Sequence, residues 1–135
     1  MVDFISSLVQ YVEKVWNFLD TNGPQTEHII IEKTNLKTNE LCFAVGWLAK
    51  ENKISKDDTT YKLGETNLIS TIGKDAGNVW KILDMWGEVD IASIARLAKI
   101  DESDVFYAVG WLAREDKISG KKPSSVKCNC LFWLK

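Results

Sequence analysis

The chain has 135 residues, of which 45% are hydrophobic and 27% are charged, and both values are ordinary for a globular protein. Its formal net charge of −2 excludes a strong overall basic field of the kind that gathers nucleic acid. No apolar run approaches the length of about eighteen residues that spans a membrane, and no secretory signal pattern is present. With three cysteines, an odd number, we expect a reduced, cytoplasmic protein without a disulfide framework and without a membrane partner.

A long segment of the sequence occurs twice. Residues 44–55 read AVGWLAKENKIS, and residues 108–119 read AVGWLAREDKIS. Trp16 and Trp80 match at the same spacing, as do Gly23 and Gly87, and no insertion is needed between these positions. A fixed internal period indicates two copies of one structural unit. We therefore predict two tandem units, residues 1–65 and residues 66–135.

In the first unit the apolar residues of segment 3–21 recur at steps of three and four, which predicts an amphipathic helix capped by Asp3. Thr26 is the expected N-cap of a short second helix. A third helix is expected from Lys37 or Thr38 to about Asn52. The alternating residues 59–63 then predict a strand of a two-stranded hairpin.

The second unit repeats this order. Its first helix is expected over residues 68–86, an extended piece near Val89, and two further helices capped by Asp90 and Asp101. A longer hairpin runs from Lys117 to the region 126–134. Residues 64–67 form the only candidate linker, which is too short for independent movement of the units.

This order of helices followed by a two-stranded wing predicts a winged helix, hence an α+β, mainly α protein. The repeated segment Ala108–Ile118 also resembles the hallmark of a family of small bacterial and archaeal winged helix-turn-helix domains of unknown function. The resemblance extends over residues 16–55 and 80–119. It implies the winged helix-turn-helix fold and implies no particular activity.

The third helices carry an aromatic surface around a glycine. If Leu41, Val45 and Leu48 face the core, residues 42, 43, 46, 47 and 50 face outward. The aromatic residues and glycines at these positions in both units are the candidate protein interface: Phe43, Gly46, Trp47, Phe106, Tyr107, Gly110 and Trp111. The tryptophans could pack within their own unit, or the two faces could meet each other or a second chain. Our leading hypothesis is a non-enzymatic module for protein–protein interaction or self-association.

The alternative is a DNA-binding protein similar to a transcription regulator. Five lysines and no acidic residue occupy the last nineteen positions, so the second wing is locally basic. The candidate phosphate contacts are Arg114, Lys117, Lys121, Lys122 and Lys127. In contrast, Asp101, Glu102 and Asp104 lie at the start of the third helix, where they would repel phosphates. A solvated hairpin is the simpler interpretation of these lysines.

We expect no catalytic site, cofactor or metal ion. Cys128 and Cys130 share one face of a strand, but only Cys42 and His28 could add to them, and zinc sites use about four ligands. No glycine-rich phosphate loop or nucleophile motif is present. A third hypothesis is a small-molecule pocket between the units, lined by Trp86 and Trp133.

Overall fold

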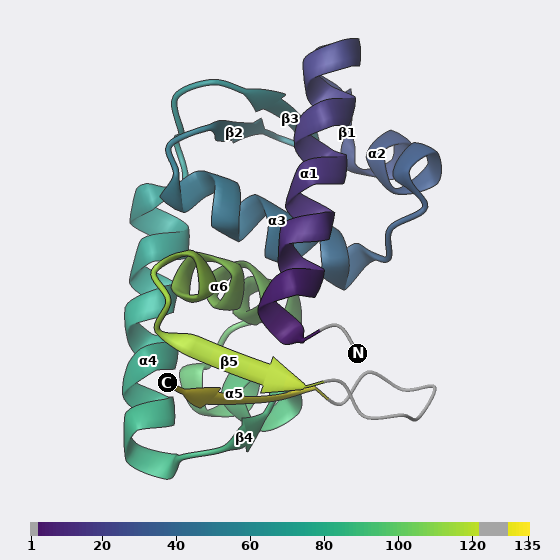
Figure 1. The fold of residues 1–135 in the computed structure, drawn as a ribbon. Helices are drawn as coiled ribbons and strands as arrows, with labels where there is room; N and C mark the ends of the chain where they lie inside the picture. Colours follow the sequence, from purple (N-terminus) through teal and green to yellow (C-terminus); the bar gives the residue numbers. More distant parts are fainter. Residues whose placement is uncertain (1–2, 122–129) are drawn as a thin grey trace.

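The computed structural model describes residues 3–121 and 130–135. The first unit contains α1 (Phe4–Asn22), β1 (Gln25–Thr26), α2 (Glu27–Thr34), α3 (Thr38–Lys50), β2 (Ile54–Asp57) and β3 (Thr60–Leu63). The second contains η1 (Ile69–Gly73), α4 (Lys74–Trp86), β4 (Val89–Asp90), α5 (Ile91–Ala98), α6 (Glu102–Arg114), β5 (Ile118–Lys121) and β6 (Leu131–Leu134) (Figure 1). These elements confirm the predicted α+β, mainly α fold of two winged helix-turn-helix units.

Local signals explain where the helices of the first unit begin and end. The backbone N–H of Ser6 donates to Asp3 Oδ1 at 2.8 Å, and the N–H of Ile29 donates to Thr26 Oγ1 at 3.4 Å. This bond from Ser6 lowers the pKa of the exposed Asp3 carboxyl. Gly23, with φ of +74°, ends α1 in a conformation that other residues rarely adopt. Both predicted N-caps, Asp3 and Thr26, are therefore confirmed.

The helices of the second unit depart from expectation in two ways. Residues 69–73 form a π-helical turn rather than the first turn of the predicted α-helix, in a stretch where β-branched residues and Gly73 have low helix propensity. Asp90 and Asp101 occupy the N-cap positions of α5 and α6. Neither side chain donates or accepts a capping hydrogen bond with the described residues.

Each unit has a three-stranded antiparallel sheet, with the order β1-β3-β2 in the first and β4-β6-β5 in the second. The short strands β1 and β4 are the extended residues predicted before the second helix of each unit. Gln25 pairs with Tyr61 in the first sheet, and Val89 pairs with Phe132 in the second. The register therefore makes Tyr61 and Phe132 structural equivalents, although the constant spacing of the repeat ends before them.

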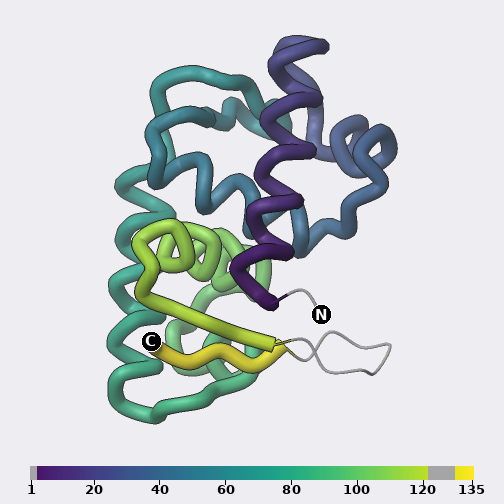
Figure 2. Tube along the Cα trace, in the orientation of Figure 1, coloured from purple at the N-terminus to yellow at the C-terminus, as the bar shows by residue number. Residues whose placement is uncertain are grey.

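The two units share their cores. The core of the second unit includes Leu8, Cys42 and Phe43 of the first, and the core of the first unit includes Ile72 of the second. Figure 2 shows the reason: the start of α1 lies beside β5, and η1, which leads into α4, lies beside α3. Leu8 and Ile72 are equivalent positions, so the exchange is reciprocal. The sequence boundary near residue 65 does not divide the interior.

The linker is attached to the first wing. The side chain of Asn67 accepts from Lys56 N–H at 3.0 Å and donates to Lys56 C=O at 2.9 Å. The N–H of Thr66 donates to Asn52 Oδ1 at 2.9 Å. These bonds fix the direction in which the chain enters the second unit.

Within the described part of the chain, no helix combines the length and hydrophobicity that crossing a bilayer requires.

Candidate functional site

The third helices, α3 and α6, pack directly against each other. A Cβ atom placed on Gly46 would overlap the carbonyl oxygen of Tyr107 and lie 2.8 Å from its carbonyl carbon. A Cβ placed on Gly110 would overlap the carbonyl oxygen of Phe43 and lie 2.9 Å from its carbonyl carbon. Both glycines are therefore required for the backbones of α3 and α6 to approach this closely.

This arrangement decides where the candidate interface residues lie. The aromatic surface of each unit is turned toward the other unit of the same chain rather than toward solvent. It is not available to a second chain while the units remain together. If the face around Gly110 were open to a second chain, as the sequence suggested, arginine at Gly110 would leave each unit folded. The structure contradicts that expectation, because even a methyl group at Gly110 would overlap the backbone of α3.

Phe43 crosses the interface into an apolar pocket of the second unit. Its ring centroid lies 5.1 Å from that of Phe106 and 6.3 Å from that of Phe132, both in edge-to-face geometry. Phe4, from the start of α1, lies 5.7 Å from both Phe43 and Phe132. Phe43 is fully buried and Phe106 almost so. The four rings form a continuous aromatic cluster in geometries that aromatic pairs favour.

Tyr107, the equivalent of Phe43, crosses in the opposite direction into a polar pocket of the first unit. Its hydroxyl lies 2.5 Å from that of the fully buried Tyr61. Burial raises the pKa of the Cys42 thiol to about 12, partly offset by a hydrogen bond with Tyr107. Burial also raises the pKa values of Tyr61 and Tyr107, so all three groups are held protonated at neutral pH. Lys56 Nζ lies 5.3 Å from the ring of Tyr61 and 5.8 Å from that of Tyr107.

The two tryptophans of the repeated segment are partly buried at the edge of the interface. Trp47 packs against the core that belongs mainly to the second unit. Trp111 packs against both cores, and its ring would lie 3.3 Å from a Cβ placed on Gly73. Lys50 Nζ lies 5.3 Å from the centroid of the Trp111 ring. Trp111 therefore contacts both units, and Trp47 packs mainly toward the opposite one.

The candidate phosphate contacts are largely engaged by acidic side chains. Arg114 Nε donates to Glu51 Oε2 of the other unit at 3.0 Å, and Lys50 pairs with Glu115 at 3.6 Å in the equivalent contact. Lys117 lies 3.5 Å from Glu115. Lys121 lies 4.0 Å from Glu88. Lys122 and Lys127 lie outside the described residues.

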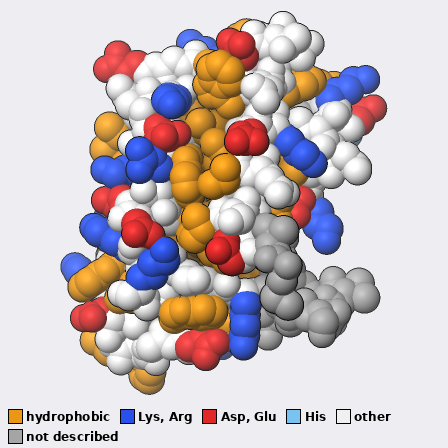
Figure 3. Space-filling view, in the orientation of Figure 1, with side chains coloured by type: hydrophobic (Ala, Val, Ile, Leu, Met, Phe, Trp, Pro, Cys, Tyr) orange, Lys and Arg blue, Asp and Glu red, His pale blue; other side chains and the backbone are white. Residues whose placement is uncertain are grey.

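The face of the molecule in Figure 3 also lacks an extended basic area. Hydrophobic side chains form a band down its middle, over α3 and α6 and between α1 and α4. Acidic and basic side chains are mixed on both sides of the band (Figure 3). This view therefore shows a mixed-charge border around an apolar strip rather than a field of one sign.

Among the residues that the structure describes, those considered for metal binding do not assemble. Cys42 and Cys130 are buried and form no disulfide bond with a described residue, and Cys128 lies outside the described residues. His28 is exposed on α2, where it lies 3.8 Å from Glu32. Among residues 3–121 and 130–135 no group of three or more potential metal ligands was found.

A small cavity of about 140 Å³ lies between the units. Its lining is Val45, Lys56, Leu68, Thr71, Ile72, Asp75, Asp104 and Tyr107. Desolvation, followed by the nearby Asp104 carboxylate, raises the pKa of Asp75. Neither Trp86 nor Trp133 lines this cavity, so the pocket between the units that the sequence suggested is not built from those tryptophans.

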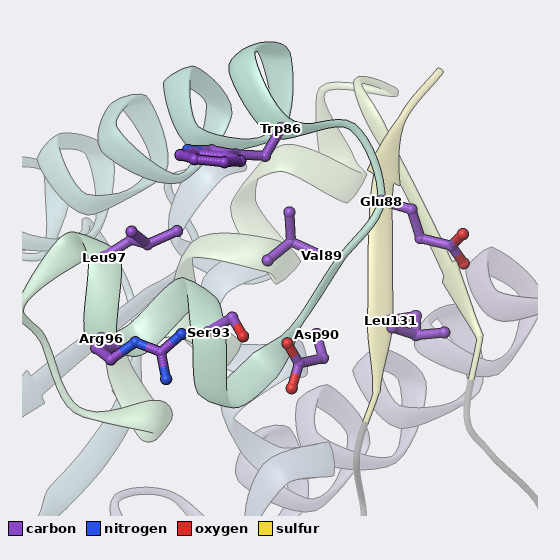
Figure 4. A pocket seen from close by; sticks show the side chains of 8 residues that line it. All are labelled: Trp86, Glu88, Val89, Asp90, Ser93, Arg96, Leu97 and Leu131. Atoms are coloured by element: carbon purple, nitrogen blue, oxygen red, sulfur yellow. The ribbon is translucent and has the colours of Figure 1, made fainter.

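Trp86 instead lines a groove that belongs to the second unit alone. We call it the α5 groove; its volume is about 530 Å³, and its lining is Trp86, Glu88, Val89, Asp90, Ser93, Arg96, Leu97 and Leu131. Figure 4 shows Trp86 at the end of α4 on one side, with Leu97, Arg96 and Ser93 of α5 opposite. Apart from Trp86, nothing in the sequence indicated this groove, because its lining combines the end of α4, β4 and α5 with Leu131 of the distant strand β6.

Comparison with known proteins agrees with the internal repeat. A family model described as a winged helix-turn-helix domain (DUF2582) matches the chain twice, over residues 11–64 and residues 65–130. Searches of curated proteins and of solved structures gave no match. The two family matches are adjacent, and together they span most of the chain.

Proposed function

The chain belongs to this winged helix-turn-helix domain family, and from that premise we propose that it is a non-enzymatic module that binds protein rather than DNA. Winged helix-turn-helix domains often bind DNA, with the third helix in the major groove and its side chains against the base edges. In this chain the two third helices, α3 and α6, are instead packed against each other, and this favours a protein partner.

The observation that carries the proposal is the mutual burial of α3 and α6. Gly46 and Gly110 bring the two backbones into contact, and Phe43 is fully buried in the opposite unit. A helix covered in this way cannot enter a groove of DNA unless the units separate. Because the cores are shared through Leu8 and Ile72, separation would expose interior side chains of both units.

The charges support the same conclusion. Arg114 and Lys117 of the candidate phosphate contacts are paired with Glu51 and Glu115. The first turn of α6 carries Glu102 and Asp104, which oppose the approach of a phosphate. DNA contact through the second wing is the alternative function, and Lys121 is its main candidate in the described part of that wing.

The buried titratable groups support a non-enzymatic role. A catalytic cysteine or tyrosine needs access to substrate and a pKa suited to giving up its proton. Cys42, Tyr61 and Tyr107 are instead enclosed between the units with raised pKa values. Their arrangement suits a structural hydrogen-bond network better than a nucleophile.

The test compares DNA and protein binding by the full chain. A fluorescent generic duplex is titrated at about 50 mM salt, where phosphate contacts are strongest. The immobilised chain is also incubated with cell extract, with and without nuclease. We expect no duplex binding and capture of proteins that nuclease does not release. The control for the wing is the double variant Lys121→Glu with Lys122→Glu.

Duplex binding by the wild type that this double variant abolishes would overturn the proposal in favour of the DNA-binding alternative. If nuclease treatment released every protein captured from the extract, that result would also favour the DNA-binding alternative. Protein capture that is equal in wild type and double variant would support the proposal, because a protein-binding surface need not involve the wing lysines.

A further inference from the structure

The fold does not require the α5 groove to be apolar. Four of its lining residues are apolar, and the first unit has a polar residue at each equivalent position: Asn22 for Trp86, Gln25 for Val89, Lys33 for Leu97 and Thr60 for Leu131. The first unit therefore shows that this backbone folds without apolar side chains at those positions.

The apolar side chains of the α5 groove remain largely exposed. Trp86 is 62% exposed and Leu97 is 43% exposed. Met85, which precedes Trp86, is 78% exposed and replaces Thr21 of the first unit. Met85 therefore adds another exposed apolar side chain at the end of α4, outside the groove lining. Exposed apolar area of this kind marks a surface that a macromolecule covers.

The charge at the groove is also specific to the second unit. Arg96 has no ion pair or hydrogen bond with any described residue, whereas its equivalent, Glu32, lies 3.8 Å from His28. Glu88 is near Lys121, and its carboxylate points away from Trp86, Leu97 and Arg96 (Figure 4). Among the described residues, Arg96 therefore presents a guanidinium without an ion-pair partner beside the apolar side chain of Leu97, and a guanidinium pairs best with a carboxylate.

We propose that the α5 groove binds a peptide segment of a partner protein that carries a large apolar side chain and one neighbouring carboxylate. The inference rests on the proposed function and specifies the site and partner chemistry for it. The apolar side chain of the partner lies between Trp86 and Leu97, and its carboxylate pairs with Arg96. Aromatic and arginine side chains are the residues that most often dominate the energy of such contacts.

Asp90 limits the charge of the partner. Its carboxylate lies on the same side of the groove as Arg96 and Ser93 (Figure 4). A segment with several carboxylates, or a nucleic-acid backbone, would bring a second negative charge toward Asp90 and be repelled. A single carboxylate next to an apolar anchor avoids that repulsion, so the partner is expected to be mildly rather than strongly acidic.

The experiment selects ligands with the whole chain rather than assuming one. Random peptides displayed on phage are enriched on immobilised full-length protein, and the consensus peptide is synthesised with a fluorescent label. We expect enriched peptides to share an aromatic or long aliphatic residue next to one Asp or Glu. Titration of the isotope-labelled chain with that peptide should shift the indole N–H resonance of Trp86 and the amides of α5.

Two variants test the contacts by giving the second unit the residues of the first. Trp86→Asn combined with Leu97→Lys should weaken binding of the consensus peptide at least about tenfold, since both sides of the apolar site are lost. Arg96→Glu should reverse the preference, so that a peptide with Lys in place of its carboxylate binds more tightly than the original. Ile69→Ser is the matched control. It removes a side chain that is 59% exposed at the far end of the same helical segment, and binding should not change.

The possible outcomes distinguish a failure of the groove assignment from a failure of the proposed function. Peptides that enrich but bind the Trp86→Asn, Leu97→Lys variant as tightly as wild type would overturn the groove assignment and leave protein binding standing. Equal binding of acidic and basic peptides to wild type would overturn the assigned partner chemistry. Failure to enrich any peptide, while the extract experiment retains proteins, would overturn the groove but not the function. If the chain retains only nucleic acid, the function and the groove assignment fail together. Circular dichroism confirms that each variant is folded.

Discussion

The two units have the same backbone plan, but the contents of their equivalent pockets are different. At the interface, the second unit encloses Phe43 with Phe106 and Phe132, whereas the first encloses Tyr107 with Cys42 and Tyr61. On the outside the units differ as well, because the apolar residues that line the α5 groove of the second unit are replaced by polar residues at the equivalent positions of the first.

This divergence shows what a tandem arrangement permits. In a symmetric dimer of identical chains every substitution occurs twice, at two equivalent sites. When both copies are part of one chain, a substitution occurs once, so one pocket can become polar while its equivalent stays apolar. Gly46 and Gly110 are among the positions that did not diverge, because the contact between α3 and α6 needs a glycine from each side.

The largest expected effect comes from breaking that shared contact. Gly110→Ala should lower the free energy of unfolding by about 3 kcal/mol, because the new methyl group can be accommodated only if α6 moves away from the Phe43 carbonyl. Gly46→Ala should have a similar effect against Tyr107. Chemical denaturation of the purified full chain measures both. Equal effects from the two variants would show that the interface itself is still symmetric.

Gly77→Ala is the matched control for the glycine variants. Gly77 is helical like Gly110, but a Cβ placed on it meets nothing within 4 Å. Alanine should stabilise this position by about 0.5–1 kcal/mol, because it is the better helix former. If Gly110→Ala were also stabilising, α3 and α6 could not be in backbone contact, and the shared-core arrangement would be wrong.

A medium effect is expected from converting the polar pocket toward the apolar one. Tyr107→Phe leaves the buried hydroxyl of Tyr61 without its partner at 2.5 Å, which should cost about 1–3 kcal/mol of unfolding free energy. Tyr61→Phe should cost a similar amount. The double variant resembles the pocket of the second unit and should recover much of the loss, since replacing both partners can be nearly neutral. Additive losses in a double-mutant cycle would show that the hydroxyls do not interact.

The smallest effect is expected at the cavity between the units, which Asp75 lines. Asp75 is the equivalent of Tyr11 in the first unit. Asp75→Asn removes a carboxylate whose pKa is raised by desolvation and by Asp104. Because the pKa of Asp75 is higher in the folded state than in the unfolded state, ionisation of this carboxyl lowers the free energy of unfolding at pH values above the folded-state pKa. Below the unfolded-state value of 3.8 the carboxyl is protonated in both states, and this cost is absent. The variant should therefore gain less than about 1 kcal/mol at pH 7, because the site is partly solvated. Denaturation at pH 7 and pH 4 should show a smaller gain at pH 4. A gain that does not depend on pH would exclude the charge of Asp75 as its cause.

The sequence alone was enough to predict the repeat, the order of elements and most helix limits. Those features depend on contacts between residues close in the chain, such as Asp3 with Ser6 or Thr26 with Ile29, and local patterns report such contacts directly. The π-helical start of the second unit was missed because the apolar spacing there fits an α-helix equally well.

Only the tertiary structure shows which part of the molecule covers each surface. Helical spacing placed Phe43, Gly46 and Gly110 on a face away from their own core, but it could not say whether solvent, a second chain or the other unit covers that face. The α5 groove was beyond the sequence for a related reason: Trp86, Leu97 and Leu131 meet only after α4, α5 and β6 have packed. Periodicity records the direction of a side chain relative to its own element, whereas burial depends on where every other element lies.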